Sequence, residues 1–104
     1  MPNYRINSNW NDEMELRCLL IFKKLKEEGF PKKGRQVELC NELSKHSGIA
    51  SNNLSAKVGN YKSVAKINNP SHASINTKRI YAQYGNLSST EIYALIAKNY
   101  QTCI

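Results

Sequence analysis

Acidic residues are missing from the middle of this 104-residue chain, where none lies between Glu42 and Glu91. The whole chain has 15 lysines and arginines against 8 aspartates and glutamates, which gives a formal net charge of +7. A cationic segment without opposing carboxylates attracts polyanions, so nucleic acid is the favoured class of partner. Many basic proteins bind no nucleic acid, so charge needs the support of a suitable binding surface.

Long apolar runs and a secretion signal are also missing. No run approaches the roughly 18 apolar residues that span a membrane, and residues 1–8 lack the apolar core of a signal peptide. We therefore expect no membrane partner and a cytoplasmic location. The length fits one domain, at residues 10–100, between an arm at 1–9 and a tail at 101–104.

Sequence signatures of catalysis and of metal binding are absent as well. The three cysteines, Cys18, Cys40 and Cys103, show no C-x-x-C spacing, which argues against zinc and disulfides and favours buried thiols in the helices. His46 and His72 have no second ligand at the close spacing that metal-dependent nucleases use. No glycine-rich phosphate loop or nucleophile motif occurs. We expect neither an enzyme nor a cofactor.

Apolar residues at helical spacing predict an all-α fold with about five helices. The first expected helix, apolar on two sides, should form the centre of the core. Residues 63–72 are interpreted as a short extended piece followed by a turn, and a small wing is a further possibility for this segment. The expected helices run from a cap at Asn9 or Asn11 to about Glu28, from Arg35 to Lys45, over 52–62, from a cap at Ser74 or Asn76 to Gly85, and onward from a capping box at residues 88–91.

A turn over residues 47–50, with Gly48 inside it, separates the second and third expected helices. The arrangement is a helix-turn-helix outline with a slightly long turn. In the third helix, Leu54, Val58 and Tyr61 form an apolar face, while amides, hydroxyls and lysines lie opposite. We expect this third helix to lie in the major groove of duplex DNA. Two packed helices with a solvated polar face are the alternative interpretation.

The candidate DNA contacts are polar and cationic side chains on and around this third helix. The expected hydrogen-bond donors to base edges or phosphates are Asn52, Asn53, Ser55 and Asn60. The cations expected to neutralise backbone charge are Lys57, Lys62 and Lys66, with Lys45, Lys78 and Arg79 as outer contacts. Trp10 and the tyrosines can stack on bases, but their positions favour packing in the core or in a dimer.

Three segments together resemble a known family: Trp10-Asn11-Asp12-Glu13 at the head of a leucine-rich helix, residues 54–61, and residues 80–88. Over residues 10–96 the chain resembles the helical, DNA-binding-like amino-terminal domain that precedes HNH nuclease domains in restriction endonucleases. The resemblance implies that Lys57 and Asn60 are family-typical positions. The chain departs from the family at residues 64–73, which lack the customary Asp-Pro and glycines. It has no HNH motif, so nuclease activity is not implied.

Two further functions remain open. A short, stand-alone copy of a domain that is normally fused to a nuclease suits a phage or mobile-element protein that binds and inhibits a host defence nuclease. A protein complex that survives high salt would favour that function. A regulator of its own promoter would share the DNA chemistry, but it would need a homodimer to contact paired half-sites, with tyrosines of the last two helices at the interface.

Overall fold

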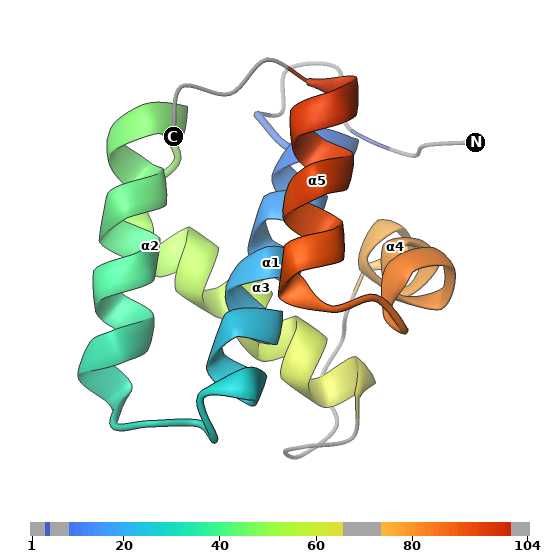
Figure 1. The fold of residues 1–104 in the computed structure, drawn as a ribbon. Helices are drawn as coiled ribbons and strands as arrows, with labels where there is room; N and C mark the ends of the chain where they lie inside the picture. The colour runs from blue at the N-terminus through green and yellow to red at the C-terminus, as the bar shows by residue number, and fades with distance from the viewer. Residues whose placement is uncertain (1–3, 5–8, 66–73, 101–104) are drawn as a thin grey trace.

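The computed structural model describes Tyr4, residues 9–65 and residues 74–100 (Figure 1). The helices in these residues are α1 (Asp12–Glu27), α2 (Lys33–Ser47), α3 (Ser51–Val64), α4 (Ile75–Tyr84) and α5 (Ser89–Asn99). No strand occurs in the described residues, and the predicted all-α fold with five helices is confirmed. The turn and wing expected within residues 66–72, most of the arm and the tail at 101–104 lie outside the described residues.

Helix α1 is the centre of the fold, as its two apolar sides predicted. It packs against each of the other four helices, and α3 also packs against α2 and α4. Cys18, Leu19 and Phe22 on α1 are completely buried, and they belong to a single cluster of core side chains. The ring of Phe22 lies 6.2 Å from that of Phe30 and 6.5 Å from that of Tyr81, measured between centroids. One core therefore holds all five helices.

Side-chain caps begin three of the five helices, and they were predictable. The Asn11 carboxamide oxygen accepts a hydrogen bond from the backbone of Met14 at 2.9 Å, which selects Asn11 over Asn9 as the first cap. Ser74, not Asn76, caps α4. At α5 the expected capping box is present: Ser88 Oγ accepts from the Glu91 amide, and the Glu91 carboxylate accepts from the Ser88 amide.

The boundaries of α2 and α3 differ from the predicted ones. Helix α2 is two residues longer at each end than the expected 35–45. Its start has no side-chain cap that the sequence would reveal, and its carboxyl end continues to Gly48, which stops it in a left-handed conformation. Helix α3 extends through Val64, so the extended piece expected at that residue is wrong. Gly85 ends α4 in an ordinary helical conformation. A Cβ atom there would lie 2.4 Å from the Tyr81 carbonyl oxygen, and this close approach requires glycine.

A helix that crosses a membrane must be both long and predominantly apolar. None of the described helices is long and apolar enough to cross a membrane.

Candidate nucleic-acid interface

The turn between α2 and α3 has a fixed geometry that sets the direction of α3. Gly48 adopts φ +76°, a left-handed backbone conformation that residues other than glycine rarely adopt. The Ser44 hydroxyl donates a 2.6 Å hydrogen bond to the Ile49 carbonyl oxygen, and the Ile49 amide donates to Ser47 Oγ at 3.2 Å. Ile49 itself is buried. The turn is thus held by hydrogen bonds and by an apolar anchor.

The amino-terminal half of α3 presents amides to solvent, as predicted. Asn52, Asn53 and Ala56 are exposed, whereas Leu54 between them is completely buried and fixes this half of the helix to the core. The Asn52 carboxamide oxygen accepts a 3.0 Å hydrogen bond from the Asn53 backbone amide. A carbonyl oxygen has two lone pairs, so one acceptor position and both amide N–H donors of Asn52 stay available for a ligand.

The two serines of this half are held by side chains of α2. Ser51 Oγ donates to the Asn41 carboxamide oxygen at 2.6 Å, and the Gln36 amide donates to Ser55 Oγ at 2.7 Å. The oxygen of the same Gln36 carboxamide accepts a 2.8 Å hydrogen bond from Lys62 Nζ. Ser55 and Lys62 were expected to meet DNA, but both are half-buried and connect α3 to α2.

Lys57 is the clearest correction to the predicted site, because its side chain points into the protein. Only 12% of the side chain is exposed, and its Nζ lies 2.9 Å from the carboxylate of Glu15, of which 1% is exposed. Nζ also donates to Thr77 Oγ1 at 3.0 Å and lies 4.6 Å from the centre of the Trp10 ring. Its position in the core is incompatible with a phosphate contact.

The buried carboxylate of Glu15 connects three helices through further hydrogen bonds. Its Oε1 accepts from the Tyr61 hydroxyl on α3 at 2.7 Å and from the Thr77 hydroxyl on α4 at 3.1 Å. Tyr61 is completely buried, which assigns it to the core and not to base stacking. With Lys57 and Trp10 these residues form what we call the Glu15 cluster, and neither the burial of Glu15 nor its partners had been inferred from the sequence.

The Tyr61 hydroxyl in this cluster makes stability sensitive to alkaline pH. Burial, and then the neighbouring Glu15 charge, raise the pKa of Tyr61 far above its ordinary value of 10.0. Above pH 10 the folded protein keeps this proton while the unfolded chain releases it. The contribution of the Tyr61 hydroxyl to the free energy of unfolding is therefore complete below pH 10 and is lost as the pH rises above 10. We expect Tyr61→Phe to lose less stability than the native chain across an alkaline series of urea unfolding experiments.

At neutral pH the same variant should be less stable by about 1 to 3 kcal/mol, because Glu15 loses a hydrogen-bond donor. The two proteins differ only in the Tyr61 hydroxyl, so the comparison isolates the phenol. Parallel loss of stability by the two proteins above pH 10 would contradict the assignment.

The remaining predicted cations divide into exposed and bound ones. Lys45, in the last turn of α2, and Lys78, on α4, are exposed as expected. Arg79 instead binds Asp12, with Nη2 at 2.6 Å from its carboxylate, and this contact holds the pKa of Asp12 below its usual range. Asn60 is half-buried, and Lys66 lies outside the described residues. The exposed candidates are therefore Asn52, Asn53, Lys45 and Lys78.

A shallow hollow lies beside the exposed amides, between α2 and α3. Its volume is about 470 Å³, and it is lined by Val37, Ser51, Asn52, Ser55 and Ala56. Val37, in α2, is 42% exposed and contributes an apolar surface to this hollow. In the sequence, Val37, Cys40 and Leu43 lie at helical spacing and mark this helix, but only Cys40 and Leu43 are buried, and Gln36 had not been singled out.

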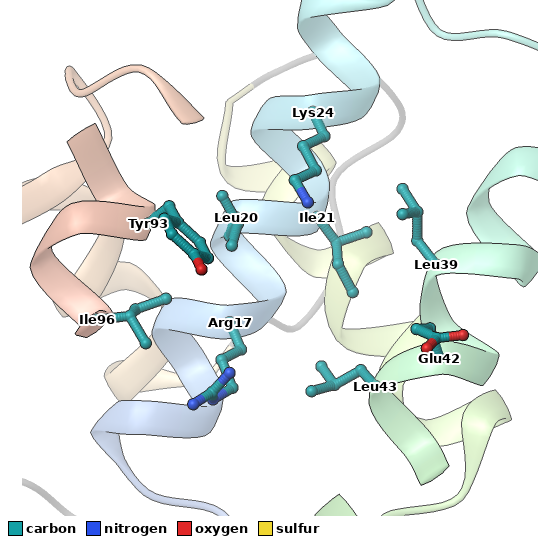
Figure 2. A pocket seen from close by; sticks show the side chains of 9 residues that line it. All are labelled: Arg17, Leu20, Ile21, Lys24, Leu39, Glu42, Leu43, Tyr93 and Ile96. Carbon is teal, nitrogen blue, oxygen red and sulfur yellow. The ribbon is translucent and has the colours of Figure 1, made fainter. Parts of the chain in front are cut away.

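A second pocket, of about 100 Å³, opens on the side of α1 that faces α2 and α5 (Figure 2). Its floor is Leu20 and Ile21 of α1, and Tyr93 of α5 stands at its edge with 45% of its surface exposed. Helix α3 lies on the opposite side of α1 (Figures 1 and 2). The other lining residues are Arg17, Lys24, Leu39, Glu42, Leu43 and Ile96.

Cysteine and histidine chemistry adds little to either surface. Cys18 and Cys40 are buried free thiols, as predicted, and burial raises the pKa of both. His46 is exposed in the last turn of α2, and no group of three or more metal-ligating side chains occurs in the described residues. Cys103 and His72 lie outside those residues.

Comparison with known proteins leaves the family resemblance as an expectation. No protein-family model matches this chain, and neither a curated protein nor a solved structure does.

Proposed function

We propose that this chain binds duplex DNA as a helix-turn-helix module without catalytic activity, with the amino-terminal half of α3 in the major groove. The observation that carries the proposal is the exposed pair Asn52 and Asn53 at the start of a helix that Gly48 directs and Leu54 anchors. Residues at the amino-terminal end of the recognition helix contact base edges in helix-turn-helix proteins. Asparagine supplies the paired donor and acceptor that such contacts use.

Electrostatics at the same end of α3 supports the proposal. The first turn of α3 has no acidic residue, and a helix carries the positive end of its dipole at its amino terminus. Lys45 lies just before the turn and is exposed. The withdrawal of Lys57, Lys62 and Arg79 into internal contacts reduces the expected phosphate contacts, so we expect modest affinity with a shallow dependence on salt.

Fluorescence anisotropy with a labelled random-sequence duplex across a salt series tests the proposal. We expect Lys45→Ala to reduce the slope of log affinity against log salt by about one unit, as the loss of one phosphate contact does. Asn52→Ala combined with Asn53→Ala should weaken binding by about tenfold on duplexes that carry the preferred base, since a bidentate contact contributes about 1 to 3 kcal/mol of discrimination against the wrong base. Lys98→Ala, which removes an exposed lysine of α5, is the matched control and should change neither quantity.

No binding at low salt would reject the DNA function, and equal effects of Lys45→Ala and Lys98→Ala would reject the α2–α3 face as its contact surface. The second result would mean that diffuse positive charge, and not the α2–α3 face, attracts the DNA.

A protein-binding function is the second candidate, and the pocket between α1, α2 and α5 favours it. An apolar floor with the exposed aromatic Tyr93 at its edge is typical of surfaces that receive a side chain of a partner. The partner in this second proposal is a nuclease of a host defence system. Tyr93→Asp should abolish a complex that survives high salt and leave DNA binding intact, because α3 lies on the opposite side of α1.

A further inference from the structure

The hollow between α2 and α3 offers a ligand two kinds of group. Val37 and Ala56 contribute exposed methyl groups, and Asn52 contributes a carboxamide with both N–H donors and one acceptor position available. The hydroxyls of Ser51 and Ser55 also line the hollow, but each already has a hydrogen-bond partner on α2. A matching ligand therefore needs an apolar projection next to a donor–acceptor pair.

We infer that this hollow receives the 5-methyl group of thymine while Asn52 binds the adenine of an A·T pair in the major groove. The inference rests on the proposed DNA binding and adds the base pair that the surface prefers. Adenine presents an acceptor at N7 and a donor at N6, which complement the Asn52 N–H and oxygen. Thymine presents the methyl group, and contact with small aliphatic side chains is the usual way in which proteins recognise it.

A G·C pair fits the same surface poorly. Guanine presents two acceptors in the major groove, so it offers no donor to the open acceptor position of Asn52, and no arginine or lysine that would satisfy both acceptors lines the hollow. Cytosine presents an amino donor, which a carboxylate accepts, and the hollow has no acidic side chain. A G·C pair also has no methyl group to contact Val37, which is 42% exposed in the free protein.

Four hairpin duplexes test the inference by fluorescence anisotropy at low salt: alternating A–T, the same with deoxyuridine for thymidine, alternating G–C, and alternating inosine–C. Deoxyuridine removes only the methyl group, so we expect the affinity to fall about fourfold for each methyl that the hollow covers. Inosine–C has the major groove of G·C and a minor groove like that of A·T. It should therefore bind as weakly as G–C.

Variants connect the preference to the residues that line the hollow. Val37→Ala should reduce the ratio between the thymidine and deoxyuridine duplexes, and Asn52→Ala should reduce the ratio between the A–T and G–C duplexes. Lys98→Ala should retain both ratios.

Equal affinity for thymidine and deoxyuridine duplexes would overturn the inference while leaving the proposed DNA binding in place. Tight binding of inosine–C would also overturn it, since the preference would then come from the minor groove. Failure to bind any of the four duplexes would reject the inference and the proposed function together.

Discussion

Replacing Lys57 by methionine is expected to lower the free energy of unfolding by about 3 to 5 kcal/mol, the usual cost of leaving a buried charge without its partner. The carboxylate of Glu15 is 1% exposed and lies 2.9 Å from Lys57 Nζ. Without this cation the folded chain must keep an uncompensated negative charge in its core. Urea unfolding followed by the fluorescence of Trp10, the only tryptophan, measures the loss.

A matched control separates this effect from a change in overall charge. Lys45→Met also lowers the net charge by one, but Lys45 is exposed, and the stability should change by no more than about 0.5 kcal/mol. The double variant Lys57→Met with Glu15→Gln should recover much of the loss. Glutamine is neutral and still offers a carbonyl oxygen to the Tyr61 and Thr77 hydroxyls.

The single variant Lys57→Met also distinguishes two interpretations of Lys57. An exposed Lys57 on a phosphate would give Lys57→Met normal stability, weaker DNA binding and a flatter salt slope. The Glu15 cluster instead predicts an unstable protein whose folded fraction keeps the native salt slope. Native stability of Lys57→Met would mean that the ion pair is absent in solution.

Much of the fold follows from local sequence. Asn11, Ser74 and Ser88 mark three helix starts because a cap acts within three residues of its own position. Helical spacing identified Leu54, Val58 and Tyr61 as buried, which the structure confirms. The start of α2 was less predictable, since no side-chain cap fixes it.

The Glu15 cluster left a signal in the sequence that helical spacing could have revealed. Lys57 lies three residues after Leu54 and four before Tyr61, so it belongs to the apolar stripe of α3. Glu15 likewise precedes Cys18 and Leu19 by three and four residues on α1. Two opposite charges, each within an apolar stripe, indicate a buried pair. Its partners depend on how α1, α3 and α4 pack, which local patterns do not determine.

The residues of the candidate site likewise divide into those whose exposure was predictable and those whose contacts were not. Asn52 and Asn53 were predictable as exposed because they lie off the apolar stripe of α3. Ser55 and Lys62 were not predictable as internal contacts, since both depend on Gln36 of the neighbouring helix. A side chain that would be exposed on an isolated helix is buried where another helix packs against it. The sequence alone does not specify which face of the helix that is.

Leu54→Ala is the second variant for which a large effect is expected, about 2 to 5 kcal/mol of lost stability. Leu54 is completely buried, and it follows directly after the two exposed amides Asn52 and Asn53. Truncation removes apolar contacts and leaves a cavity beneath the amino-terminal half of α3. Urea unfolding with an unchanged denaturant slope would assign the loss to the folded state.

The same change should also weaken DNA binding, because the amides of Asn52 and Asn53 are positioned by the contacts that Leu54 makes with the core. Leu54→Met keeps the volume and is the control, with an expected cost below about 1.5 kcal/mol. DNA titrations without urea, at a temperature where Leu54→Ala is still folded, separate loose positioning from unfolding. Full affinity of the folded variant would show that the amides do not depend on Leu54, and a loss of stability below about 1 kcal/mol would contradict its place in the core.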